Sequence, residues 1–152
     1  MKKVLAVVLL WSLTGLVSTQ AQDRGGIPHD LPTPPIQTGG EIAARAAIEV
    51  WLALVDDGQF DKSWDNAAKA VQKTVSKDQW IKVLTDNRPK LGKLVSRNLK
   101  ATRAATILPG APKGEYVVVE YDTAFEHKKG VETITSMLDE SGQWKVSGYF
   151  FK

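Results

Sequence analysis

The stretch EYVVVEYDTAF, residues 115–125, has the alternation of a β-strand that buries one face. Its odd positions are mostly apolar: Val117, Val119, Tyr121, Thr123 and Phe125. Its other face is acidic, with Glu120, Asp122 and Glu126. A period of two residues is typical of a half-buried strand, so this segment predicts an antiparallel sheet with one covered face.

Turn residues on either side predict the pairing of this sheet. A two-residue turn at Lys129-Gly130, where Gly supplies the positive φ, predicts these opposite pairs: Phe125 with Ile134, Thr123 with Ser136, and Tyr121 with Leu138. A three-residue turn at Glu140-Ser141-Gly142 predicts a second set: Leu138 with Trp144, Ser136 with Val146, and Ile134 with Gly148. Residues 94–108 form the expected first strand, whose predicted pairs are Ile107 with Val117, Ala105 with Val119, Arg103 with Tyr121, Ala101 with Thr123, and Leu99 with Phe125.

Helical patterns fill the chain before the sheet. Residues 41–57 are apolar nearly all round, so we expect this helix to be buried on more than one side. Residues 61–75 continue helically, and a third helix opens at Ser76 and ends before Pro89. The expected fold class is α+β, with N-terminal helices packed on a curved four-stranded antiparallel meander.

The N-terminus predicts export. Lys2 and Lys3 precede an apolar run and a small-x-small site that ends at Ala21, so residues 1–21 read as a signal peptide. The run is shorter than the roughly 18 apolar residues of a membrane-spanning helix. Residues 22–40, rich in Pro and Gly, read as a tether, and residues 41–152 as a single α+β domain.

Composition excludes several classes of function. Removing Lys2 and Lys3 leaves 18 cations against 17 anions, so the mature chain is nearly neutral. The basic pI of the full sequence is therefore weak evidence for a polyanionic partner. The absence of Cys excludes disulfides, thiolate metal sites and Cys nucleophiles. The basic segment 87–113 lacks interleaved aromatic residues, so we expect no nucleic-acid binding.

Short motifs between Ala44 and Tyr149 carry a family resemblance. They are Trp51-Leu52, Asp57-Gly58, Ser63-Trp64, Trp80, Arg88-Pro89, Leu91-Gly92, Arg97, Leu108-Pro109-Gly110, Gly114-Glu115-Tyr116-Val117-Val118, Tyr121, Thr123, Phe125, Glu132-Thr133 and Trp144-Lys145-Val146-Ser147-Gly148-Tyr149. Their combination resembles the uncharacterised bacterial secreted family called domain of unknown function 4019. The resemblance implies a cystatin-like cone, a curved sheet wrapped on a helix, and implies no activity.

The predicted registers indicate one candidate ligand site. Arg103, Tyr121, Leu138 and Trp144 fall in one row, and with Arg88 and Trp80 they could hold a carboxylate or a phosphate. Arg97 lines up with His127 and Glu132 near the other end of the sheet. The candidate ligand-binding residues are therefore Arg88, Arg97, Arg103, Tyr121 and Trp144. The alternative is that the arginines stack on aromatic rings with their charged heads in solvent.

Two further patterns leave alternatives open. A row of small residues, Ala101, Thr123, Ser136 and Val146, either receives the first helix or lines a cavity; we favour helix packing, with Trp51 in the core. His127 opposite Glu132 resembles an oriented general base, but a pair at a hairpin tip is usually a solvated ion pair. His29 lies in the tether without a partner His, so we expect no metal ligand there.

These patterns favour an exported, non-catalytic binding or interaction module. The alternative is an enzyme or a small-anion binder that uses a cavity between the first helix and the sheet. We expect no catalytic residues, no cofactor and no metal. The expected partner is a protein or a small anionic ligand, without stable membrane insertion after signal cleavage.

We expect the mature chain to begin at Gln22, because a charged start, an apolar run and a small-x-small site precede it. Mass spectrometry of the protein recovered from the cell envelope measures its N-terminus. An intact chain from Met1 to Lys152 in that fraction contradicts the prediction.

Overall fold

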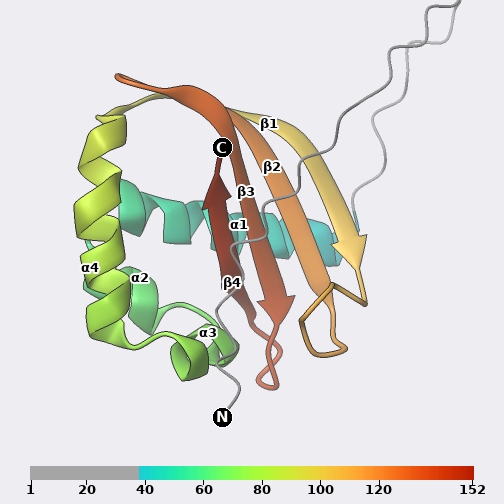
Figure 1. The fold of residues 1–152 in the computed structure, drawn as a ribbon. Coiled ribbons are helices and arrows are strands. Elements are labelled where there is room, and N and C mark those ends of the chain that lie inside the picture. The colour runs from blue at the N-terminus through green and yellow to red at the C-terminus, as the bar shows by residue number, and fades with distance from the viewer. Residues whose placement is uncertain (1–37) are drawn as a thin grey trace, which may run out of the picture.

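The computed structural model describes residues 38–152, so the predicted signal peptide and nearly all of the tether lie outside the described residues. The helices are α1 (Gly39–Asp56), α2 (Phe60–Asp65), α3 (Lys69–Thr74) and α4 (Lys77–Asn87), followed by the 3-10 helix η1 (Arg88–Leu91). The strands are β1 (Leu94–Ala105), β2 (Tyr116–Phe125), β3 (Lys129–Leu138) and β4 (Trp144–Phe151). They form one antiparallel sheet in the order β1-β2-β3-β4, so the predicted α+β class and four-stranded meander are confirmed (Figure 1).

Capping boxes begin the two longest helices. Thr38 accepts a hydrogen bond from the Glu41 amide, and the Glu41 carboxylate accepts one from the Thr38 amide at 2.8 Å. Ser76 and Gln79 make the same reciprocal pair at the start of α4. Each box satisfies amide groups that have no partner within the helix, and this fixes where the helix begins.

One predicted helix is broken in two. Residues 61–75 form α2 and α3, and between them the Ala68 amide donates to the Val146 carbonyl of β4 at 2.8 Å. Ala67 also makes an isolated parallel bridge with Val146. The backbone leaves the helix here because it pairs with part of the edge of β4.

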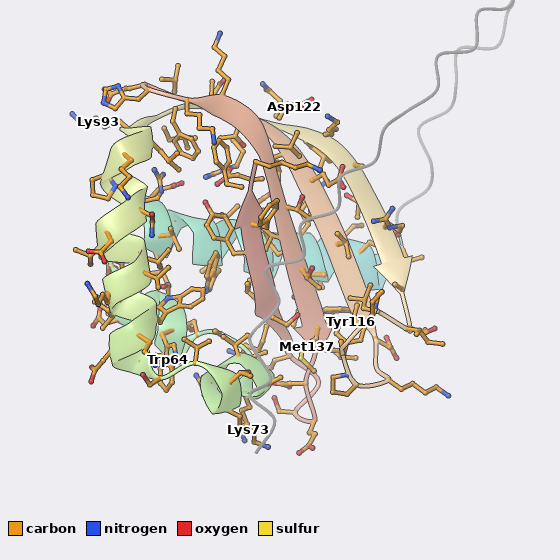
Figure 2. The ribbon with its side chains drawn as sticks, in the orientation of Figure 1. Trp64, Lys73, Lys93, Tyr116, Asp122 and Met137 are labelled. Atoms are coloured by element: carbon orange, nitrogen blue, oxygen red, sulfur yellow. The ribbon has the colours of Figure 1, made fainter. Side chains whose placement is uncertain are left out.

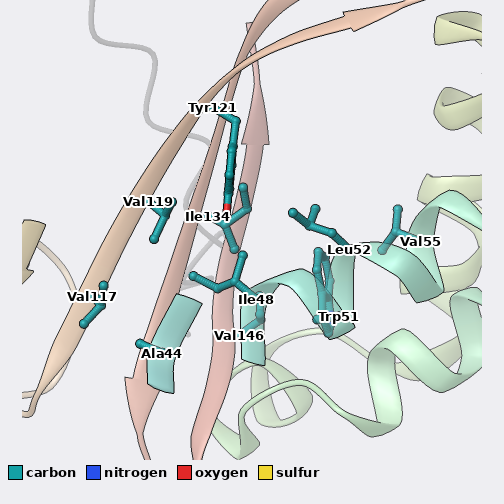
Figure 3. Packing of buried hydrophobic residues seen from close by; sticks show 10 residues of the cluster. All are labelled: Ala44, Ile48, Trp51, Leu52, Val55, Val117, Val119, Tyr121, Ile134 and Val146. Atoms are coloured by element: carbon teal, nitrogen blue, oxygen red, sulfur yellow. The ribbon is translucent and has the colours of Figure 1, made fainter. Parts of the chain in front are cut away.

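The core lies between α1 and one face of the sheet (Figure 3). Along α1 the buried residues recur at helical spacing: Ala44, Ile48, Trp51, Leu52 and Val55. They pack on sheet residues that alternate along the strands: Val117, Val119, Tyr121, Ile134 and Val146. Burying each large aliphatic side chain contributes roughly 1.5–3 kcal/mol. The expectation that α1 packs on the sheet with Trp51 in the core is confirmed.

As expected, α1 is buried on more than one side, because it packs on the sheet and, through the hydrogen bond from the Trp51 indole to the Ser63 carbonyl, on α2. Part of its surface stays open, however: Val50 is 69% exposed and Ile42 is 51% exposed. The apolar pattern of the sequence therefore includes residues that the described part of the chain leaves open to solvent.

The predicted β2–β3 register is wrong. The turn comes earlier, at residues 126–128, where the Phe125 amide donates to the Lys128 carbonyl at 2.8 Å. Tyr121 therefore lies opposite Glu132, and Thr123 lies opposite Gly130. The slip is an even number of residues, so the same side chains still face the core.

Gly130 serves a purpose other than the predicted turn. A Cβ atom at this position would lie 2.1 Å from the carbonyl oxygen of Lys152. Residue 130 must therefore be glycine, because the backbone of Lys152 occupies the space of a side chain. A turn predicted from this glycine alone is placed at the wrong residues.

The other two registers differ at bulges. In the β3–β4 pair, Leu138 lies opposite Trp144 and Ser136 opposite Val146, as predicted, but a bulge at Thr135 and Ser136 then places Tyr149 opposite Ile134.

All the predicted β1–β2 pairs are wrong. The observed pairs include Ala105 with Tyr116, Arg103 with Val118, Leu99 with Tyr121 and Arg97 with Thr123, and bulges interrupt them at Leu94/Ser96 and Leu99/Ala101.

Candidate functional site

Two carboxylates and two guanidinium groups meet at the end of α1. Asp56, the last residue of α1, accepts hydrogen bonds from Arg88 Nη2 at 2.6 Å and from Arg97 Nη1 at 2.7 Å. Arg97 also donates to Glu132, from Nε at 2.6 Å and from Nη2 at 3.1 Å. We call these four residues the buried charge network. Its formal charges cancel.

Glu132 is the most deeply buried member of this network, with no exposed surface. Besides Arg97, its carboxylate accepts hydrogen bonds from the Thr123 hydroxyl at 2.7 Å and from the Tyr149 hydroxyl at 2.8 Å. A buried carboxylate carries a large desolvation cost unless it is paired and hydrogen-bonded. Here both of its oxygens have partners, so the charge is retained inside the fold.

Four elements position the network. Glu132 alternates with Ile134 and Ser136 on the core face of β3, and Arg97 comes from the neighbouring part of β1 opposite Thr123. Arg88 enters from η1 and lies over the Phe125 ring, with its guanidinium carbon 4.2 Å from the ring centroid. Together with the hydrogen bonds from Thr123 and Tyr149 to Glu132, these contacts tie the end of α1 to η1 and to all four strands.

Three side chains in and around the network have raised pKa values. Burial alone lowers the pKa of Arg97, but its hydrogen bonds to Asp56 and Glu132 and their charges outweigh this, so its pKa is raised. Burial raises the pKa of Tyr121 to about 12. Burial also raises the pKa of Tyr149, and the charge of Glu132 raises it further. The neutral phenols and the charged guanidinium are thus the forms that the fold favours.

The proposed ligand residues are only partly gathered. Arg88 and Arg97 come together, and Tyr121 lies beside them opposite Glu132. Arg103 pairs with Val118 and lies exposed on the other face of the sheet. Trp144 begins β4 and packs near Gly40, and Trp80 donates instead to the Ser63 hydroxyl at 2.9 Å. The two arginines that meet are held by carboxylates of the chain itself, which occupy the positions that an anionic ligand would take.

His127 does not lie opposite Glu132, so that expected pair is wrong. The exposed His127 lies in the β2–β3 turn, where its amide donates to the Leu91 carbonyl at 3.0 Å. Glu132 instead meets Arg97, the other residue that was predicted to lie in line with it. Among residues 38–152 there is no group of three or more His, Asp or Glu side chains that could hold a metal ion.

Sequence reasoning missed Asp56, the residue that joins the two arginines. One signal was present: a carboxylate in the last turn of a helix faces the negative end of the helix dipole. Such a residue requires a compensating cation, and the basic segment that follows Asn87 supplies two.

The row of small residues is not continuous. Ser136 and Val146 are neighbours, whereas Ala101 lies opposite Glu120 and Thr123 lies opposite Gly130. Ser136 is fully buried and its hydroxyl donates to the Lys145 carbonyl at 3.2 Å. Buried side chains of α1 fill the space over this part of the sheet.

A groove opens on the outer side of α1, between this helix and β4. Its volume is about 300 Å³, and its lining is mostly apolar: Ala46, Ala47, Val50, Trp51, Leu54, Asn66, Trp144, Lys145 and Val146. We call it the α1–β4 groove. Trp51 is fixed beneath it, because its indole Nε1 donates to the Ser63 carbonyl at 2.8 Å.

Most of the described chain matches a known protein family. The model of the family described as protein of unknown function (DUF4019) matches residues 47–149. The chain belongs to this family. The match includes the buried charge network, β1 to β3, most of β4 and all of the groove residues except Ala46. No curated protein and no solved structure matches the chain. No helix in the described part of this DUF4019 chain is long and apolar enough to cross a membrane.

Two tyrosines beside Glu132 give a matched test of the site. Tyr149→Phe removes a hydrogen bond to a buried carboxylate, so it should lower the free energy of unfolding at pH 7 by about 1.5–3 kcal/mol. Tyr121→Phe removes a buried hydroxyl that has no hydrogen-bond partner among the described residues, so its stability at pH 7 should equal or exceed the parent's. Urea melts of both variants measure these changes, and the opposite order of stability contradicts the assignment.

The raised pKa of Tyr121 predicts that the free energy of unfolding depends on pH in the alkaline range. A tyrosine whose pKa is raised in the folded state stabilises the fold below its ordinary pKa of about 10 and loses that contribution as the pH rises toward the folded value. The parent should therefore lose stability between pH 10 and 12, and Tyr121→Phe should lose less over this window. Equal losses for the two proteins would contradict the raised pKa of Tyr121.

Proposed function

We propose that this DUF4019 protein is exported and acts as a non-catalytic interaction domain that binds a partner protein in the α1–β4 groove. The observation that carries the proposal is the groove together with the exposed apolar residues beside it. Val50 both lines the groove and is 69% exposed. A contiguous apolar surface around a hollow is typical of a site for protein contact.

The size and lining of the groove favour an apolar side chain of a protein as its occupant. A volume of about 300 Å³ lies at the lower end of the range for small-molecule pockets. Its walls are Ala, Val, Leu and Trp side chains, and the polar groups in its lining come from Asn66 and Lys145. This composition resembles the pocket of an interface anchor, where a large apolar group is buried and a few polar groups surround it.

The state of the buried charge network supports a role without catalysis. Both carboxylates and both guanidinium groups are engaged with one another, and the Glu132 oxygens are further occupied by Thr123 and Tyr149. A general base or a nucleophile needs a free position for the reacting group. The same engagement weighs against the alternative of a small anion held by Arg88 and Arg97.

Export is proposed from the sequence of the N-terminus. Residues 1–21 have the charged start, apolar run and small-x-small site of a signal peptide. A chain without Cys, stabilised by packing and by a buried ion network, needs no particular redox environment to fold. The proposed place of action is the periplasm or the extracellular space.

Binding of small side-chain mimics tests the groove. We expect N-acetyl-phenylalanine amide and N-acetyl-leucine amide, titrated into the isotope-labelled chain from Gln22 onward, to shift the amide NMR signals of Ala47, Val50, Asn66 and Val146. The variant Ala47→Leu places three further carbon atoms in the groove and should raise the Kd at least tenfold. Because these atoms enter an open hollow, the variant should remain as stable as the parent.

The matched control is Ala43→Leu, an exposed position on the same helix that does not line the groove. It should leave the Kd unchanged. Shifts centred on another surface, or equal affinities of Ala47→Leu and the parent, would overturn the proposed site.

A further inference from the structure

The first strand forms an open edge of the sheet. Among the described strands, β1 pairs with β2 on one side only, and the strand order places it at the end of the sheet. The run Ala101–Ala105 pairs with β2 without a bulge, so its geometry is that of a regular strand. An edge of this kind presents backbone N–H and C=O groups that can pair with another extended chain.

Side chains along this run leave the edge accessible. Ala101 and Ala104 are exposed and small, so they offer little hindrance to an approaching backbone. Apolar residues flank the run, with Leu99 45% exposed on one side and Ile107 75% exposed on the other. Backbone pairing supplies affinity in such a mode of binding, and flanking side chains supply contacts to alternate residues of the added strand.

Charge identifies the kind of chain that fits. The segment from Asn87 to Lys113 contains seven cations and no acidic residue. Arg88 and Arg97 form ion pairs in the buried charge network, and Lys100 forms an ion pair with Asp122 at 3.0 Å. Arg103 and Lys113 form no ion pair with any residue of the described chain; Arg103 lies exposed in the middle of the run, and Lys113 lies exposed in the loop between β1 and β2. An added strand with acidic residues would therefore meet unneutralised cations.

We propose that the β1 edge at Ala101–Ala105 binds an extended acidic segment of another protein by strand addition. This site lies on the sheet edge and is separate from the α1–β4 groove, so it does not rest on the proposed groove function. A second copy of the chain fits less well, because antiparallel pairing of two β1 edges would bring the cations of both copies together, and like charges opposite one another destabilise a strand pair.

Two synthetic peptides test the proposal. One is an eight-residue peptide of alternating Val and Glu, and the other has Lys in place of Glu. In low salt, fluorescence anisotropy should detect binding of the glutamate peptide and none of the lysine peptide, and the binding should weaken as salt is added. Hydrogen exchange of those amides in residues 101–105 that do not donate to β2 should slow at least tenfold in the complex.

Charge variants separate this edge from general attraction to a basic protein. Arg103→Glu should raise the Kd of the glutamate peptide at least tenfold, and Arg103→Gln should raise it less. The control is Lys73→Glu, at an exposed position on α3 (Figure 2). Just before α3, Ala67 pairs with Val146 of β4, the strand at the opposite edge of the sheet from β1. The Kd of this control should differ from the parent's less than twofold. Thermal melts show that each variant is folded.

Three outcomes would overturn the proposal. The first is equal binding of both peptides. The second is protection of amides outside β1, including those of the groove, when the glutamate peptide binds. The third is a concentration-dependent dimer that protects residues 101–105 without peptide, which would assign the edge to a second copy.

Discussion

The contact between Arg97 and Glu132 is the interaction on which the arrangement of elements depends. Glu132 is fully buried on β3, and the guanidinium of Arg97 on β1 reaches it by two hydrogen bonds. The same guanidinium reaches Asp56 at the end of α1, and Asp56 in turn holds Arg88 of η1. Removing one partner of a buried ion pair typically costs about 3–5 kcal/mol, because the remaining charge is left in a medium of low dielectric. The position of α1 against the sheet is therefore set by electrostatics at one end and by apolar packing along its length.

This distribution of charge places the candidate binding surfaces outside the core. The buried charge network satisfies its own carboxylates, whereas the exposed surface carries apolar residues at the α1–β4 groove and the unpaired cation Arg103 on β1. A fold that fixes its interior in this way can present both a helix face and a strand edge with little rearrangement, which reduces the entropic cost of binding. The family match brings no activity with it, so function rests on what these surfaces can bind.

Much of the fold was predictable from local patterns, and much of the site was not. The alternation of residues 115–125 predicted which face of β2 is buried, and an even slip in register preserved that prediction. The predicted register of β2 and β3 was wrong because Gly130 was interpreted as a turn residue. It is a glycine because the Lys152 backbone lies against it and leaves no room for a side chain. Both capping boxes are local features of the sequence, because each joins residues three positions apart. Asp56 and Arg88 are separated by 32 residues and meet through tertiary packing, which no local pattern encodes.

A double-mutant cycle on Arg97 and Glu132 tests this account most directly. Arg97→Leu and Glu132→Leu should each lower the free energy of unfolding by about 3–5 kcal/mol, because the first leaves the Glu132 carboxylate without a cation and the second leaves Arg88 and Arg97 with a single carboxylate. The double variant leaves Asp56 paired with Arg88 and no charge stranded, so its loss should be smaller than the sum of the two by at least ~2 kcal/mol. Urea melts of the four proteins measure this coupling energy. Losses that add to within about 0.5 kcal/mol would show that the two residues act independently and would contradict the account.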